Sequence, residues 1–201
     1  MNHSMPDLLA LACKAARAAS EAILEIYGQD DFVVVDKANH SPLTAADLAA
    51  HNIIKEMLEP TGLPLLSEEG KHLPYEERRH WERFWLVDPL DGTKEFIKRN
   101  GEFTVNIALI EGQAPVLGVV HVPVTDVLYA ALRGQGAFKE AAGVRSELHT
   151  ALAQVTDPRL RVVASRSHRD ADTEAFLASL DAPEVVSMGS SLKFMLLAEG
   201  T

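Results

Sequence analysis

The sequence predicts a layered α/β protein with an antiparallel sheet at its centre. Three observations support this prediction. Two amphipathic helical patterns occupy residues 7–27 and 44–58. Several short apolar segments separated by turn residues follow within residues 103–139. Strand and helix patterns then alternate within residues 161–199, which is typical of a second layer of βα units.

The composition fits a globular protein of one domain or two small ones. Apolar residues make up 47% and charged residues 24% of the 201 residues, so disorder and fibrous repeats are poor interpretations. The net charge of −10 argues against binding to a nucleic-acid polymer, although a pocket could still bind a small anion. Cys13 is the single cysteine, which excludes an intramolecular disulfide.

No targeting or membrane segment is predicted. The first twenty residues contain only a short apolar run with no basic segment before it, unlike a signal peptide. No stretch reaches the 18 apolar residues of a transmembrane helix. We therefore expect a cytoplasmic protein, and the sequence leaves its oligomeric state open.

The first helix is predicted over residues 7–27 because Leu8, Ala12 and Ala15 begin a series of apolar residues spaced by three and four. Gly28 is placed to end it. The many alanines indicate close packing against another layer. A short strand is expected over residues 32–35, followed by a polar loop to residue 42 and the second helix.

Two buried strands are predicted to deliver acidic residues at their ends. The segment of residues 63–66 leads to Glu68 and Glu69, and the segment of residues 84–87 leads to Asp88. An antiparallel meander should follow, with a turn near Gly112. Its strands are predicted at residues 103–110, 116–122, 127–132 and 137–139.

The second layer is predicted from alternating segments after a polar boundary near residues 143–157. We expect residues 1–145 to form the first, α+β layer and residues 146–201 to begin the second. Its expected elements are strands at residues 161–164 and 184–188 and helices at residues 173–180 and 191–199.

The segment Asp88-Pro89-Leu90-Asp91-Gly92-Thr93 carries the strongest chemical signal. Pro89 blocks a continuous helix, so we expect a tight turn on which Asp88, Asp91 and the Leu90 carbonyl face one point. Carboxylate and carbonyl oxygens suit Mg²⁺, and a pair of such ions can clamp a phosphoryl group. The backbone N–H groups of Gly92 and Thr93 would bind phosphate at the start of a short helix.

The alternative interpretation gives this segment only a structural role, as a strand-to-helix turn capped by Asp. The spacing of the two acids also disfavours an aspartyl-phosphate mechanism, which needs acids two residues apart. Attack by a water that the ions activate is therefore the preferred chemistry.

Two further acidic positions can join this site. Either Glu68 or Glu69 would supply the carboxylate that brings the ions together, although adjacent acids in a loop are often simply solvated. Asp47 lies in Thr44-Ala45-Ala46-Asp47, which also matches a capping box. It could reach the Thr93 hydroxyl and form a relay that polarises the attacking water.

Several basic and polar residues could contact a second phosphate or a nucleotide. The eight histidines show no metal-ligand spacing, so a zinc enzyme is disfavoured. His168 follows a predicted strand end, where it could contact a nucleotide or lie in a polar surface loop. Ser190 could cap the last helix, and Lys193 one turn later could bind phosphate. Lys94 is either solvated or faces the substrate.

Three segments resemble the lithium-sensitive, Mg²⁺-dependent phosphatases of the inositol monophosphatase superfamily. They are Ser67-Glu68-Glu69, residues 85–93 and Gly189-Ser190-Ser191. Within that superfamily, residues 94–106 are similar to the bacterial 3'(2'),5'-bisphosphate nucleotidases. Inositol-specific members usually carry Thr-Asn-Phe after Asp-Gly-Thr, whereas this sequence has Lys94-Glu95-Phe96.

The resemblance implies a layered α-β-α-β-α sandwich and a defined set of site residues. It implies that two or three Mg²⁺ ions are bound by Glu68, Asp88, the Leu90 carbonyl and Asp91. It implies catalytic roles for Asp47, Glu68 and Thr93. The substrate contacts that it implies are Glu68, Leu90, Asp91, Gly92, Thr93, Lys94, His168, Ser190 and Lys193.

The implied reaction removes the 3'-phosphate of adenosine 3',5'-bisphosphate, giving AMP and phosphate in sulfate assimilation. The alternatives are an inositol or sugar phosphatase of the same superfamily and a shortened, non-catalytic nucleotide- or metal-binding protein. Family membership also leaves open peripheral association with the cytoplasmic face of the inner membrane.

One feature departs from the superfamily pattern. Its members carry a Trp-Asp motif beyond the helix expected at residues 191–199, and this sequence has no Trp after Trp85. The resemblance therefore implies a second layer that lacks at least one strand and one helix. It also implies that a second Mg²⁺ ion, short of one carboxylate, is bound weakly.

Overall fold

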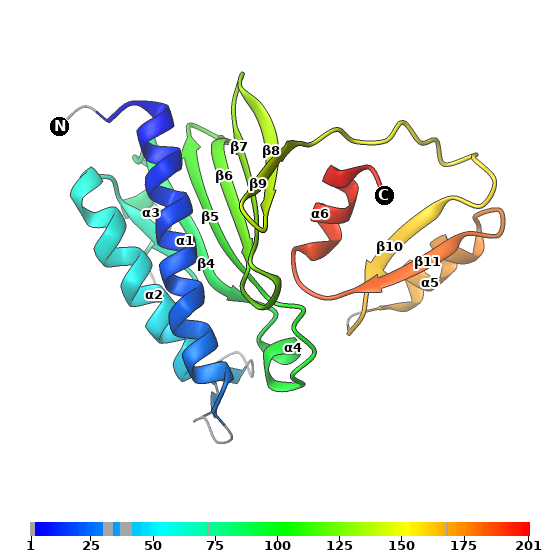
Figure 1. The fold of residues 1–201 in the computed structure, drawn as a ribbon, viewed down its shortest axis with the longest axis horizontal. Helices are drawn as coiled ribbons and strands as arrows, with labels where there is room; N and C mark the ends of the chain where they lie inside the picture. The colour runs from blue at the N-terminus through cyan, green and yellow to red at the C-terminus, as the bar shows by residue number, and fades with distance from the viewer. Residues whose placement is uncertain (1–2, 30–33, 37–41, 72, 168) are drawn as a thin grey trace.

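The centre of the molecule is a seven-stranded sheet. The structure, a computed structural model, describes residues 3–29, 34–36, 42–71, 73–167 and 169–201. Strand β3 pairs in parallel with β4, and every later neighbour in the sheet pairs antiparallel, which confirms the predicted meander (Figure 1). The strands, in spatial order, are β3 (Leu65–Ser67), β4 (Arg83–Asp91), β5 (Thr104–Glu111), β6 (Ala114–Val122), β7 (Val127–Leu132), β8 (Gly136–Ala141) and β9 (Val144–Glu147).

Two long helices cover one face of this sheet (Figure 1). They are α1 (Met5–Tyr27) and α2 (Ala45–Leu58), close to the predicted ranges. Helix α1 starts two residues before the predicted start because Ser4 and Asp7 form a capping box. Among the described residues, no helix has the length and apolar character needed to cross a bilayer.

The alternation of side chains along each strand separates the two faces of the sheet. In β4, Trp85 and Val87 are buried against the helices, whereas Leu86, between them, is 43% exposed on the opposite face. Contacts join α1 to β5, β6 and β7 and join α2 to β4. The opposite face is therefore the one that carries Asp88, one residue beyond Val87.

The remaining small elements lie around this core. A two-stranded antiparallel ladder, β1 (Val34–Asp36) with β2 (Pro42–Thr44), precedes α2. The strand predicted over residues 32–35 is confirmed where it is described, and residues 37–41 of the predicted loop lie outside the described part. The short helices are η1 (Glu59–Thr61), α3 (Tyr75–Arg78), α4 (Thr93–Ile97) and η2 (Pro123–Thr125).

The second group of elements confirms the predicted alternation of strands and helices. Strands β10 (Arg161–Ser165) and β11 (Glu184–Met188) pair in parallel through α5 (Ala171–Ala178), and α6 (Leu192–Glu199) follows. Figure 1 places this group beside the β7–β9 side of the large sheet. The division at residue 145 remains a prediction.

Two sequence-based expectations need correction. Strand β9 falls in the region expected to be an irregular boundary, and all four of its residues are exposed, so no apolar alternation marked it. Strand β4 does not end at Val87 in a tight turn. It continues to Asp91 with a bulge, because three steps along β4 from Asp88 to Asp91 match two steps along β5.

Close packing of α1 depends on its alanines. Ala15 of α1 is fully buried against the neighbouring elements, whereas Ala10 of the same helix is exposed. We expect Ala15→Leu to lower the free energy of unfolding by about 1–3 kcal/mol, because extra methylenes overfill a packed core. Ala10→Leu is the matched control and should change it by less than about 0.5 kcal/mol. Urea unfolding measures both, and equal effects would contradict close packing at Ala15.

A buried histidine connects α1 to the sheet. His121 on β6 is 3% exposed, and its Nδ1 lies 2.6 Å from the Ser20 hydroxyl of α1. Its Nε2 lies 3.1 Å from Asp126 Oδ1. Burial lowers the pKa of His121, although Asp126 opposes this shift.

This lowered pKa predicts a loss of stability in acid. Below about pH 6.5 the unfolded chain binds a proton at His121 more readily than the folded chain does. The free energy of unfolding therefore decreases as the pH is lowered. We expect His121→Asn to have a flatter dependence between pH 8 and pH 5, measured by urea unfolding. The exposed His149→Asn should keep the wild-type slope. A wild-type slope in His121→Asn would contradict this assignment.

Candidate metal and phosphate site

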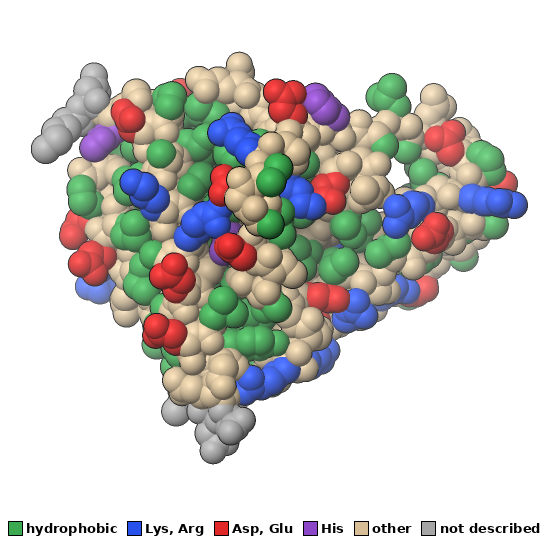
Figure 2. Space-filling model, in the orientation of Figure 1, with side chains coloured by type: hydrophobic (Ala, Val, Ile, Leu, Met, Phe, Trp, Pro, Cys, Tyr) green, Lys and Arg blue, Asp and Glu red, His purple; other side chains and the backbone are tan. Residues whose placement is uncertain are grey.

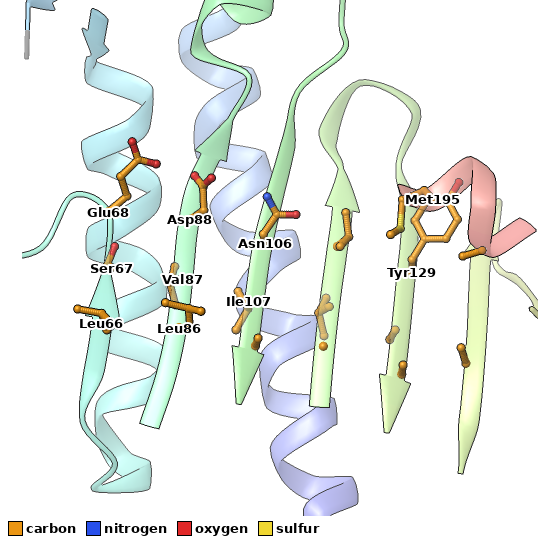
Figure 3. A pocket seen from close by; sticks show the side chains of 18 of the residues that line it. Leu66, Ser67, Glu68, Leu86, Val87, Asp88, Asn106, Ile107, Tyr129 and Met195 are labelled. Atoms are coloured by element: carbon orange, nitrogen blue, oxygen red, sulfur yellow. The ribbon is translucent and has the colours of Figure 1, made fainter. Parts of the chain in front are cut away.

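The pairing of two parallel strands brings Glu68 and Asp88 together. Ser67 pairs with Val87, and the Glu68 N–H donates to the Val87 carbonyl at 3.1 Å. The next residue on each strand is therefore an acid at the same sheet edge. Figure 3 shows both carboxylates at the same end of their strands, with the Asn106 side chain of β5 beside Asp88.

The bulge in β4 brings a third carboxylate, Asp91, to this edge. Asp88 pairs with Asn106, and Asp91 pairs with Thr104. Hydrogen bonds from the Ser191 N–H and the Asn106 side chain reach the Asp91 carboxylate. The Ser191 hydroxyl donates to Asn106 Oδ1 at 2.8 Å. These bonds tie the start of α6 to the acidic edge of the large sheet.

Burial and like charge disfavour ionisation of these acids in the absence of a cation. Burial, reinforced by Asp91, Glu68 and Asp47, raises the pKa of Asp88 to about 8. Burial also raises the pKa of Asp91, although the bond from Ser191 and the charge of Lys193 oppose this. A divalent cation would reverse this effect, because it favours the charged form of a nearby carboxylate.

The residues fit a Mg²⁺ site in their chemistry. Asp88 Oδ1 is buried with no hydrogen-bond partner in the structure, which leaves one hard oxygen available as a ligand. Glu68, Asp91 and the Leu90 carbonyl offer further oxygens. In the described part of the chain, no three acids, histidines or cysteines are placed to bind one metal ion. The donor oxygens are near one another but would have to move closer to share an ion.

These donors open onto a cavity of about 380 Å³. Its lining combines carboxylates, lysine ammonium groups and serine hydroxyls. Nine of the sequence-predicted residues line it, namely Glu68, Asp88, Leu90, Asp91, Gly92, Thr93, Lys94, Ser190 and Lys193. The lining residues not predicted as site residues are Glu95, Ser165, Ser167, Gly189, Ser191 and Phe194.

Gly92 is needed at the turn beside this cavity. It has a φ of 98°, in the left-handed region, and a Cβ there would lie 2.9 Å from the Glu102 carbonyl oxygen. Thr93 follows, and its hydroxyl donates to the Leu90 carbonyl at 3.4 Å. Lys193 Nζ donates to the Ser190 carbonyl at 2.5 Å, so this ammonium lies over the start of α6.

The other two predicted residues lie away from the cavity lining or outside the described part. Asp47 lies on α2, is 1% exposed and is near enough to raise the pKa of Asp88. Asp47 therefore lies close to the site, on a helix that covers the other face of the sheet. The side chain of Thr44, the other end of the predicted capping box, is outside the described residues. His168 is outside them too.

A larger, apolar groove of about 750 Å³ adjoins the carboxylates along the same sheet face. Glu68, Asp88 and Asn106 lie at one end of it, and aliphatic side chains line the rest (Figure 3). Tyr129 of β7 and Met195 of α6 lie at its far side. This groove has little polar lining, so the smaller cavity is the candidate site for phosphate chemistry.

Comparisons with known protein sequences and structures show the family of this chain. A sequence profile of the inositol monophosphatase family matches residues 5–201. The chain belongs to this family. It is 52% identical over 197 residues to the 3'(2'),5'-bisphosphate nucleotidase CysQ of Escherichia coli strain K12, covering 96% of this chain and 77% of the relative. The corresponding nucleotidase of Buchnera aphidicola is 42% identical, over all of this chain and 75% of its own length.

Solved structures of family members share the fold. The crystal structure of CysQ from Bacteroides thetaiotaomicron superposes with a TM-score of 0.83 at 44% identity, covering 99% of this chain and 79% of that one. The IMPase of Thermotoga maritima matches with a TM-score of 0.78 at 22% identity, covering 96% of this chain and 73% of that one, which shows a common fold. The inositol monophosphatase-like fold is thus confirmed, and the chain is a homologue of the CysQ nucleotidases.

Sequence reasoning did not single out two polar residues that organise the acids. Asn106 and Ser191 lay within the segments that carried the family resemblance, but neither received a role. Their contact joins positions 85 residues apart, and no local pattern predicts it. A polar residue that interrupts the apolar run of β5 was the available signal for Asn106.

Asp88→Asn tests the metal site without reference to turnover. We expect wild-type protein to gain about 2.7 kcal/mol of stability when Mg²⁺ is raised to 100 times its dissociation constant, because only the folded state gathers the ligands. The variant should lose most of this gain and should be no less stable than wild type without Mg²⁺. Thermal unfolding at several Mg²⁺ concentrations measures both effects.

The exposed Asp181→Asn is the control for this prediction, since it removes the same charge at a residue that does not line the cavity. It should keep the full gain from Mg²⁺. An undiminished gain in Asp88→Asn would show that Asp88 binds no ion.

Proposed function

We propose that the chain is a Mg²⁺-dependent phosphomonoesterase that converts adenosine 3',5'-bisphosphate to AMP and phosphate. The observation that carries the proposal is the meeting of Glu68, Asp88 and Asp91 in one cavity with Lys94 and Lys193. Nucleotidase relatives at 52% identity support the choice of substrate.

The charge of the cavity explains why cations are part of the proposal. A phosphate dianion beside four acidic side chains is repelled, and two lysines do not balance the acids and the phosphate together. Divalent cations between the acids and the phosphate would turn this repulsion into attraction. Glu68, Asp88, Asp91 and the Leu90 carbonyl would hold these ions. Bound Mg²⁺ would polarise the phosphoryl group and lower the pKa of a water.

The chain's own residues would hold the proton and the phosphate. The Thr93 hydroxyl would orient the attacking water, and Asp47 would accept its proton through that hydroxyl. The burial of Asp47 near Asp88 supports this role, because bulk water has little access to its carboxylate. The backbone of Gly92 and Thr93 would bind the phosphoryl oxygens, at a turn with no room for a side chain at Gly92.

The basic residues would bind the rest of the substrate. Lys94 and Lys193 lie on the cavity wall, so each could contact the 5'-phosphate or the ribose side of the nucleotide. Ser190 and His168 complete the proposed set. Figure 2 shows Lys and Arg side chains over α4 and along the adjoining edge toward α5, which would favour approach of an anionic ligand to an otherwise acidic protein.

Phosphate release tests the proposal. We expect wild-type chain to release phosphate and AMP from adenosine 3',5'-bisphosphate only with Mg²⁺, with inhibition by Li⁺ and much slower release from inositol phosphate. Asp88→Asn should lower kcat/KM by at least about 100-fold. Asp181→Asn should leave it unchanged. Turnover that survives chelation of Mg²⁺, or survives in Asp88→Asn, would refute the proposal.

A further inference from the structure

Glu102 lies in the loop from α4 to β5, between the turn at Gly92 and the loop that begins at Gly189. Its carboxylate forms a bidentate pair with Arg166, with Oε2 2.8 Å from Nε and Oε1 2.6 Å from the terminal nitrogen. It also accepts the Gly189 N–H at 2.7 Å. The bonds from Arg166 and Gly189 outweigh burial and lower the pKa of Glu102, so the carboxylate is charged at neutral pH.

These bonds join the carboxyl ends of β10 and β11. Arg166 follows β10, and its guanidinium also donates to the Ser187 carbonyl of β11 at 2.8 Å. Gly189 follows β11. One carboxylate of the large sheet's layer therefore fixes both strands of the second group at the edge nearest the cavity.

The space around Glu102 is closely filled. A Cβ on Gly189 would lie 2.7 Å from Glu95 Cγ and 3.1 Å from Glu102 Cβ. A Cβ on Gly92 would lie 2.9 Å from the Glu102 carbonyl oxygen. Glu102 thus contacts the phosphate turn with its backbone and the loop of residues 189–191 with its side chain.

That loop carries groups of the site. Ser190 has a φ of 47°, a left-handed conformation that a serine adopts only when its neighbours hold it. Ser191 bonds the Asp91 carboxylate and the Asn106 side chain. Lys193 then lies on the cavity wall. A shift of Gly189 would move all three relative to the acids.

We propose that Glu102, through Arg166 and Gly189, is a positioning residue that holds the loop of residues 189–191 in place for substrate binding. This proposal rests on the proposed function, because it assigns the loop to that substrate. Glu102 does not line the cavity and acts through the loop. Its loss should therefore weaken binding more than it slows the chemical step.

Two substitutions and one control test the proposal. Glu102→Ala removes all three bonds, and we expect a rise in KM of about tenfold with kcat changed by less than about threefold, since charge-assisted bonds are lost. Glu102→Gln keeps one oxygen for Gly189 and should fall between Ala and wild type. Glu184→Ala is the matched control, because the Arg161–Glu184 pair joins the same strands at their other ends and is exposed.

Amide hydrogen exchange provides a readout that does not depend on turnover. In Glu102→Ala we expect exchange of peptides spanning residues 189–193 to rise about tenfold, with β5 and β6 peptides unchanged, because local opening follows local contacts. Unchanged β5 and β6 peptides also show that the variant folds. Arg166→Ala should give a similar rise, and the double variant should add little to it.

The outcomes separate this proposal from the function on which it rests. If wild-type chain releases no phosphate, the proposed function fails, and the exchange data alone decide whether Glu102 holds the loop. If KM and exchange stay at wild-type values in Glu102→Ala, the positioning role is overturned. The role is also overturned if Glu184→Ala changes both as much, since the effect would then come from general loosening of the two strands.

Discussion

The register of two parallel strands brings the acids of the candidate site together. Leu65 pairs with Trp85 and Ser67 with Val87, so the acids that follow share one edge and one face. A slip of one residue would turn Asp88 toward the helices while Glu68 stayed on the open face. The burial of Trp85 and Val87 against α2 opposes such a slip, because it would expose Trp85 and bury the Asp88 carboxylate in place of Val87.

The same arrangement carries an electrostatic cost that the rest of the fold must offset. Burial raises the pKa of Asp88, and repulsion from the adjacent carboxylates raises it further. The offset comes from the opposite face, where α1 and α2 bury apolar residues on β4 and β5. The two faces of the sheet thus have different roles. The packed apolar face keeps the strands in register, and the other face carries repulsion that a bound cation would relieve.

What sequence could predict here follows from how local each signal is. The spacing of Leu8, Ala12 and Ala15 predicts α1 because a helix repeats within a few residues, and strand alternation predicts the meander for the same reason. Asp88 and Asp91 were found because a short motif contains both. Strand β9 was not predicted, because an exposed edge strand needs no apolar pattern. The bond between Asn106 and Ser191 joins residues 85 positions apart, and the bond between Glu102 and Arg166 joins residues 64 positions apart. No local pattern predicts contacts over such separations.

Those long-range polar bonds have a physical role that apolar packing does not supply. Tyr129 and Lys139 of the large sheet both bond Glu199 of α6, and Ser191 bonds Asn106 at the other end of that helix. Helix α6 has no fully buried residue, so burial alone fixes its position poorly. Directional bonds at both ends define where it lies, since each works only at one distance and angle. The loop before α6 can then place Ser191 and Lys193 opposite carboxylates that come from the other half of the chain.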